Sequence, residues 1–198
     1  MKHPSSRELF AYWNARRGAH AAPERAEIEP GVIRKVLGDT FILAFDPGAG
    51  ASFRLAGTRV CTLFGRELKG SPFTAIFDES NHGAVRDLVA IVADEAVGVV
   101  AAAAGRTADG HAADLELLLL PLRHRGRLQG RMIGVLTPLA VPFWLGSSAL
   151  SAMTLGNRRH VGPAVETVAA PLLAATPPRR RGAHGLVVYE GGRPQSPR

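Results

Sequence analysis

The stretch FRLAGTRVCTLFGRELKG (residues 53–70) joins a short strand, a tight corner and a short helix. Its first five residues have a strand pattern, and Thr58, just after the glycine that ends it, is a good residue to cap a helix. The apolar residues that follow share one helical face, and Gly65 suits the position after the last turn. No nucleophile stands beside a base and no metal-binding spacing occurs, so the stretch predicts a structural corner rather than a reactive centre.

The segments on either side of this corner have strand and helix patterns. Residues 40–46 (TFILAFD) predict a buried strand that forms a hairpin with residues 53–57 across a glycine-rich turn. After the corner, Ser71-Pro72 can start a further helical turn, and residues 81–96 have the apolar spacing of a longer helix. Three short helical segments therefore follow the first two strands.

Residues 97–139 return to strand patterns. Asp109-Gly110 is the strongest hairpin signal in the sequence, and Arg125-Gly126 marks the next turn. Leucines between these turns alternate with acidic residues before the run becomes apolar throughout. The order of elements predicts an α+β fold, with a five-stranded antiparallel sheet, a helical crossover on one face of the sheet and an N-terminal helix.

An amphipathic helix is expected near the N-terminus. Ser5 and Glu8 have the spacing of a capping box, and apolar residues follow at helical intervals. These apolar residues are Leu9, Phe10 and Trp13. Such a stripe packs either on the body of the same chain or on a second copy. The three side chains are therefore candidates for a dimer or partner seam.

The composition divides the chain of 198 residues into four parts. We expect an N-terminal helical cap in residues 1–38, the α+β domain in residues 39–147, a C-terminal extension in residues 148–176 and a disordered basic tail in residues 177–198. Four of the seven net positive charges belong to the tail, which holds five arginines and one glutamate. This distribution does not favour a nucleic-acid-binding fold.

Signals for a membrane or an oxidising compartment are not found in the sequence. Residues 1–10 lack the apolar region of a signal peptide, and no apolar run is long enough to cross a bilayer. The single cysteine, Cys61, excludes an internal disulfide, and its apolar neighbours indicate a small core residue. We therefore expect a cytoplasmic protein without a membrane partner.

The order of elements, together with several longer motifs, resembles PAS domains. More narrowly, it resembles short bacterial single-domain PAS proteins with an N-terminal helical cap. The motifs are residues 9–17 in the cap, 24–43 leading into the first strand, 53–73 through the corner and 141–146 (VPFWLG) after the last strand. The resemblance spans residues 5–150 in outline. It implies a sensory or regulatory module of signal transduction, in which a helical crossover closes an apolar chamber over the sheet.

The implied chamber needs an apolar wall and a few polar groups for a ligand. The candidate residues are Leu43, Phe45, Leu55, Thr58, Arg59, Phe64, Phe73, Leu88 and Leu117. The apolar members can equally fill an ordinary core. The resemblance implies that some relatives bind haem, flavin or small metabolites and others bind nothing, so the cofactor stays open. His82 stands where a haem ligand is expected, although a solvent-facing position suits it better, and TRVCTLFG lacks the flavin photosensor motif.

Arginine clusters support a second hypothesis of another class, since arginine forks suit phosphates and guanine edges. The candidate anion-binding residues lie on one hairpin and are Arg123, Arg125, Arg127 and Arg131. Such a patch would bind DNA, an anionic partner or a cyclic dinucleotide. No aromatic residue stands beside the arginines to stack on bases, which counts against RNA.

Catalysis is not expected. The sequence contains no G-x-S-x-G, no H-E-x-x-H and no phosphate-binding glycine loop. We therefore expect a non-enzymatic regulator without a catalytic or metal site. It would act by self-association or by binding a signalling protein, either with a small ligand in the chamber or as an adaptor whose chamber is packed shut.

Overall fold

The structure is a computed structural model that describes residues 1–46, 48–125 and 127–162, with only the backbone of residues 127–129. Helix α1 (Pro4–Arg17) and the 3₁₀ turns η1 (Arg25–Glu27) and η2 (Leu37–Asp39) precede strands β1 (Thr40–Asp46) and β2 (Gly50–Ala56). Helix α2 (Thr58–Phe64), turns η3 (Phe73–Ile76) and η4 (Glu79–Asn81) and helix α3 (His82–Asp94) form the crossover. Strands β3 (Gly98–Thr107), β4 (Ala112–His124), β5 (Arg127–Pro138) and β6 (Leu150–Val161) follow. None of these helices is long and apolar enough to cross a lipid bilayer.

The strands of the described residues form one antiparallel sheet in the order β2-β1-β5-β4-β3-β6. The predicted α+β class is confirmed, but the sheet has six strands rather than five. The additional strand, β6, pairs with β3 at the edge of the sheet and comes from the predicted C-terminal extension. Residues 157–160 of β6 are all exposed, so they lack the alternation that marks a strand in a sequence. The extension beyond residue 162 and the predicted disordered basic tail lie outside the described residues.

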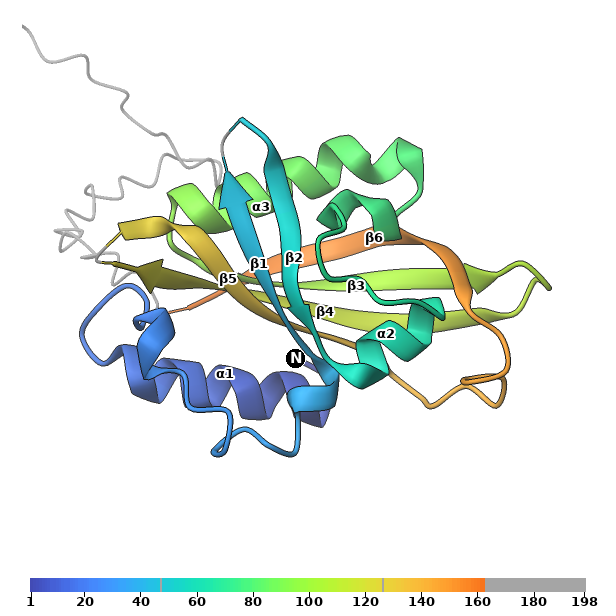
Figure 1. Cartoon of the computed structure of the whole chain (residues 1–198), viewed down its shortest axis with the longest axis horizontal. Coiled ribbons are helices and arrows are strands. Elements are labelled where there is room, and N and C mark those ends of the chain that lie inside the picture. Colours follow the sequence, from blue (N-terminus) through green and yellow to red (C-terminus); the bar gives the residue numbers. More distant parts are fainter. Residues whose placement is uncertain (47, 126, 163–198) are drawn as a thin grey trace, which may run out of the picture. The chain divides into compact units, whose positions relative to one another are not determined.

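The crossover covers one face of the sheet, here called the inner face (Figure 1). Helix α3 is amphipathic and buries its apolar stripe against this face. Four phenylalanine rings pack between η3 and the first two strands, with ring centroids 5.5 to 5.7 Å apart. They are Phe41, Phe53, Phe73 and Phe77. This aromatic cluster fills the centre of the space under the crossover.

The cap covers the opposite face, here called the outer face, with α1 lying on the other side of the strands from α3 (Figure 1). Leu9 and Trp13 are fully buried within the chain, whereas Phe10 is half-buried. The Trp13 indole donates a hydrogen bond of 2.8 Å to the carbonyl oxygen of Pro121 in β4. Two of the three predicted seam residues thus pack on the sheet of their own chain.

Helix α1 begins two residues earlier than the capping-box pattern predicted. Its first residue is Pro4, and the ring Nδ1 of the cap residue His3 accepts a hydrogen bond of 3.1 Å from the amide of Ser5. Proline is well suited to the first helical position because its missing N–H has no partner there. The Ser5 hydroxyl is used elsewhere, since it donates to the carboxylate of Asp39 at 2.7 Å.

The corner after β2 depends on a close approach of two backbone segments. A Cβ atom on Gly57 would lie 2.2 Å from the carbonyl oxygen of Leu37, so only glycine fits there. Beside it, the guanidinium of Arg59 donates two hydrogen bonds to the buried carboxylate of Asp39, at 2.6 and 2.8 Å. We call Ser5, Asp39 and Arg59 the Asp39 junction. It connects the start of α1, the start of β1 and the first turn of α2.

Candidate ligand cavity

A cavity of about 330 Å³ lies beside the aromatic cluster, where α3 faces the β1–β2 hairpin. Phe45 at the end of β1 and Phe73 in η3 supply aromatic surface, and Val85 and Val89 supply aliphatic surface from α3. The small residues 48–51 of the hairpin complete the wall. The cavity exists because the hairpin presents glycine and alanine here, which cannot fill the space beside the helix.

Polar groups border the same cavity. Thr74 of η3 and Arg86 and Asp87 of α3 line it together with the apolar side chains. Val85 and Val89 stand four residues apart on one face of α3, and this apolar face lines the cavity. Arg86 and Asp87, which follow Val85, lie at the edge of the cavity. A largely apolar hollow with a few polar groups is the usual form of a small-molecule site.

The predicted chamber residues fall into three groups. Phe45 and Phe73 line the cavity. Four others lie in the buried core of the inner face, in the same cluster as Phe73. These four are Leu43, Phe64, Leu88 and Leu117. The centre of the expected chamber is thus occupied by protein, and the open space lies at its edge.

The remaining three predicted residues lie away from the cavity. Leu55 is 45% exposed because a bulge in the β1–β2 pairing places it opposite Ile42, whose side chain packs on the outer face. Thr58 and Arg59 lie in the exposed first turn of α2. The hydrogen bond to Asp39 raises the pKa of Arg59 above its usual value, and the guanidinium serves the Asp39 junction.

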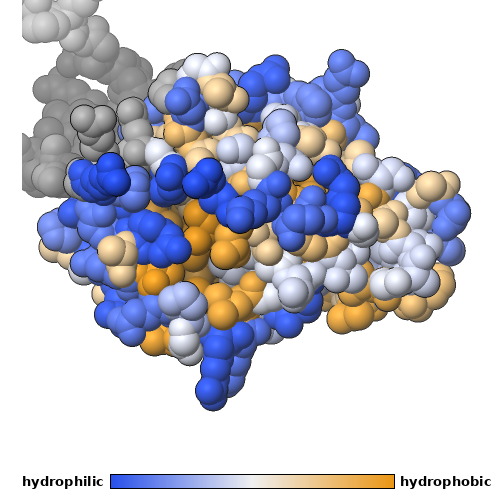
Figure 2. Space-filling view, in the orientation of Figure 1, coloured by the Kyte–Doolittle hydropathy of each residue, from blue (hydrophilic) through white to orange (hydrophobic). Residues whose placement is uncertain are grey.

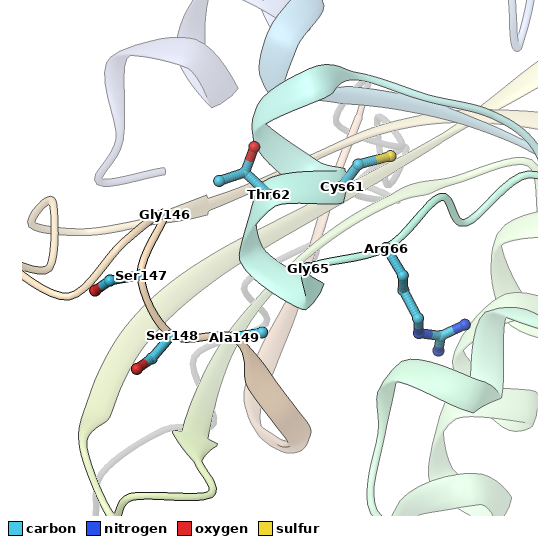
Figure 3. A pocket seen from close by; sticks show the side chains of 8 residues that line it. All are labelled: Cys61, Thr62, Gly65, Arg66, Gly146, Ser147, Ser148 and Ala149. Atoms are coloured by element: carbon cyan, nitrogen blue, oxygen red, sulfur yellow. The ribbon is translucent and has the colours of Figure 1, made fainter.

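A second hollow, of about 400 Å³, lies between α2 and the loop that precedes β6 (Figure 3). Cys61 and Arg66 line it from the α2 side, and Ser147 and Ser148 line it from the loop. Burial raises the pKa of the Cys61 thiol, whose Sγ lies 3.7 Å from Oε1 of Glu67. The thiol therefore stays protonated at neutral pH and is not an activated nucleophile.

His82 is the first residue of α3. Its Nε2 lies 3.1 Å from the carbonyl oxygen of Phe77, and the residue does not line the cavity. Among the residues that the structure describes, no three histidine, cysteine, aspartate or glutamate side chains are grouped to hold a metal ion.

The predicted anion-binding arginines have different surroundings. Arg123 forms an ion pair of 3.1 Å with Glu24. Arg125 is exposed in the β4–β5 turn, where its φ of 53° is positive. The side chain of Arg127 lies outside the described part of the chain. Arg131 is half-buried, and in the described structure no carboxylate pairs with it.

Two solved structures and one family model are similar to this chain. A PAS domain of a protein from Colwellia psychrerythraea is similar at 14% identity, over 53% of this chain and 92% of that chain, with a TM-score of 0.39. An RNA-binding light-oxygen-voltage receptor is similar at 23% identity, over 59% of this chain and 35% of the receptor, with a TM-score of 0.41. No curated protein matches. The family model of the PAS domain matches residues 1–137, which is more than half of the sequence, and the chain therefore belongs to the PAS domain family.

Proposed function

We propose that this chain is a non-enzymatic regulatory module that responds to a small, largely apolar ligand in the cavity between α3 and the β1–β2 hairpin. Membership of the PAS domain family supports a sensory or regulatory role. The single observation that carries the ligand is the cavity itself, which remains open beside a core that is otherwise filled by the aromatic cluster.

The position of the cavity suggests how a bound ligand would produce a signal. One wall is α3, which also exposes residues that do not line the cavity, namely Gly83 and Asp94. A ligand that fits better when α3 is displaced shifts the population toward that displaced state. The altered exposed surface of α3 would then change self-association or the binding of a signalling protein.

Filling the cavity tests this proposal. Ala90 lines the cavity and is half-buried, so Ala90→Phe should occupy much of its volume. Ala84 is equally half-buried on the same helix but does not line the cavity, so Ala84→Phe is the matched control. We expect Ala90→Phe to remove most of the fluorescence enhancement of the uncharged apolar dye Nile red and Ala84→Phe to retain it. Equal dye binding by the two variants would contradict a ligand site in this cavity.

The freshly purified protein gives an independent measurement. Its native mass and absorbance spectrum report a retained ligand directly, as mass above that of the bare chain or as absorption beyond that of tryptophan and tyrosine. A retained ligand that is lost in Ala90→Phe and kept in Ala84→Phe would identify the compound class and its place.

A second candidate function, that of an interaction adaptor without a ligand, is favoured by two exposed apolar side chains. Val141 and Phe143, in the β5–β6 connection, are 81% and 86% exposed. On the face shown in Figure 2, hydrophobic residues also reach the surface in several places between hydrophilic ones. Large exposed apolar side chains often mark a surface that binds another protein.

Light scattering distinguishes the adaptor from the ligand-binding module. If the chain self-associates through this connection, Phe143→Ser should reduce the mass in solution, whereas Val32→Ser, at another exposed apolar residue, should not. A mass that is unchanged by both variants would exclude this surface from self-association.

A further inference from the structure

Three arginines from distant parts of the sequence converge on the outer face of the sheet, next to the cap. They are Arg25 in η1, Arg54 in β2 and Arg131 in β5. Only Arg131 belongs to the cluster that the sequence suggested. The pairing of the strands and of the cap segment brings them together, and this pairing cannot be read from their spacing along the chain.

The position of Arg25 follows from the contact between the cap and β4. Glu24 forms a parallel bridge with Arg123, the residue after Leu122. Leu122 is in turn the partner of Arg131 across β4 and β5. Arg25, directly after Glu24, therefore lies beside this end of β5.

The position of Arg54 follows from the bulge in β2. Phe53 pairs with Leu43, and Leu43 pairs with Met132, the neighbour of Arg131. Arg54 is the extra residue of the bulge and is exposed. Strands β2 and β5 flank β1, so the two arginine backbones lie about 10 Å apart, which two long side chains can bridge.

The β1 residue between these arginines is small. Ala44 pairs with Arg131 on one side and with Ser52 on the other. Neither an alanine nor a serine side chain fills the space above the sheet between two guanidinium groups. The surface next to Arg131 is thus made of small side chains, and Arg54 follows two residues after Ser52 on the same strand.

No carboxylate neutralises this cluster in the described part of the chain. The nearby Glu24 forms its ion pair with Arg123, and the three described ion pairs include none of the clustered arginines. Arg131 donates to the carbonyl of the adjacent Gly130 at 2.7 Å. Burial, together with the like charges of Arg54 and Arg25, lowers the pKa of Arg131 below its usual value. Three positive charges thus lie close together, and no carboxylate of the described residues pairs with them.

We propose that Arg25, Arg54 and Arg131 form a binding site for a small phosphorylated ligand, on the outer face and separate from the cavity under α3. Guanidinium groups bind phosphate oxygens in pairs of parallel hydrogen bonds, and three of them match the charge of a diphosphate. A bound phosphate replaces the mutual repulsion of the arginines by attraction. This site does not depend on the ligand proposed for the cavity.

The arrangement favours a small ligand over a nucleic acid. The three arginines converge on one place rather than following a track, and the adjacent Arg123 is already paired with Glu24. A nucleic-acid site is typically an extended basic groove with aromatic residues for stacking. Phe53, the aromatic residue next to Arg54, is buried in the inner core and cannot stack on a base.

Titration of the full chain with inorganic pyrophosphate at low ionic strength tests the site. Arg54→Gln is the most informative variant, because Arg54 is exposed and its loss should leave the fold intact. We expect Arg54→Gln and Arg131→Gln each to weaken pyrophosphate binding roughly tenfold, since a charge-assisted hydrogen bond is lost. Arg25→Gln should weaken binding in the same direction.

Arg106→Gln is the matched control. Arg106 is exposed on β3 and pairs with Ala112, at the far end of β4 from Leu122. Ala112 and Leu122 are separated by about 33 Å along β4. The substitution Arg106→Gln removes the same charge as Arg54→Gln. It should leave the affinity for pyrophosphate within about twofold of the wild type, because charges this far apart are screened.

The unliganded variants give a second readout. In the absence of phosphate, Arg54→Gln should unfold at the same or a higher temperature than the wild type, because it relieves like-charge repulsion. A lower unfolding temperature would indicate a structural role and contradict the proposal. Equal loss of affinity in Arg54→Gln and Arg106→Gln would reduce the effect to net charge and also overturn it. So would tight binding of a single-stranded DNA oligonucleotide that excess pyrophosphate fails to displace.

Discussion

At the scale of single residues, Asp39 shows how a buried charge joins separate elements. Its side chain is 6% exposed, and its carboxylate receives hydrogen bonds from Ser5 of α1 and Arg59 of α2. The side chain of Arg59 is itself 54% exposed, so water reaches part of the pair. Loss of Arg59 would leave the carboxylate buried with only the Ser5 hydroxyl as a side-chain partner.

We therefore predict that Arg59→Met lowers the free energy of unfolding by about 2 kcal/mol, below the usual cost of breaking a fully buried pair because Arg59 is half in water. Urea denaturation measures this directly. The double variant Asp39→Asn/Arg59→Met should regain part of the loss, since no charge is then left buried. Arg34→Met, at an exposed arginine of the cap, should change stability by less than about 0.5 kcal/mol. A similar loss in Arg34→Met would show that arginine removal in general, and not the junction, is responsible.

Glu116 gives the fold a dependence on pH. It is 5% exposed in β4, and its carboxylate accepts hydrogen bonds from the backbone amides of Lys2 and His3. Burial raises its pKa, but the Lys2 amide, the Ser6 hydroxyl and the His3 amide together lower it below the usual value. A carboxyl group whose pKa is lower in the folded state stabilises the fold above its unfolded pKa. That stability is lost as the pH falls through the folded value.

Glu116→Gln should accordingly lower the free energy of unfolding by about 2 kcal/mol at neutral pH, because charged hydrogen-bond acceptors are lost. The difference from the wild type should shrink as the pH falls below about 4, where the unfolded carboxyl group becomes protonated. Urea denaturation across this range tests both statements. Glu8→Gln, at an exposed glutamate of α1, serves as the control. A difference for Glu116→Gln that stays constant with pH would mean that its effect does not come from ionisation.

At the scale of elements, Trp13 is one of the residues that attach α1 to the sheet. Its side chain is fully buried, and its indole N–H is bonded to Pro121 of β4. We predict that Trp13→Ala destabilises the protein by about 3–5 kcal/mol, the usual cost of removing a large buried aromatic residue. Trp13→Phe keeps most of the packing and should cost about half as much or less. Thermal or urea unfolding of the two variants tests this order, and equal stability of both would contradict an anchoring role.

The same helix shows what the sequence could and could not predict. The spacing of Leu9 and Trp13 predicts an amphipathic helix, but periodicity cannot tell whether the partner of its apolar face is the same chain or a second copy. Strand β6 was missed because residues 157–160 are exposed throughout and carry charge at consecutive positions. Its pairing with β3 depends on a partner strand about fifty residues away, and local patterns do not contain that information.

The residues predicted for a ligand chamber differ in how they lie relative to the cavity. The phenylalanines at positions 45 and 73 were expected at the chamber wall and do line the cavity. Leu55 was placed there by simple alternation, which the bulge after Phe53 interrupts. Arg25 and Arg54 were not linked to Arg131, since only the register of three strands and one cap segment brings them close.

At the scale of the whole sheet, the two faces share the same central strands. In β4, Leu117 and Leu119 belong to the inner core, whereas Leu118 and Leu120 belong to the core beneath the cap. A strand that is packed on both sides cannot shift for a ligand on one face without disturbing the packing on the other. The cavity under α3 and the arginine cluster beside the cap are therefore joined through one buried sheet.

This shared sheet predicts that the cap and the crossover side unfold together. The chain has two tryptophans, and they lie on opposite faces: Trp13 in the core beneath the cap and Trp144 in the inner core. The variant Trp144→Phe leaves Trp13 as the only tryptophan reporter, and Trp13→Phe leaves Trp144. In each variant, the urea transition followed by tryptophan fluorescence should coincide with the transition followed by far-ultraviolet circular dichroism, as for a two-state domain. If Trp13 becomes exposed at a lower urea concentration than the rest of the structure, the cap is a separate unit of stability. A structural change on the inner face would then not be transmitted to the cap through shared packing.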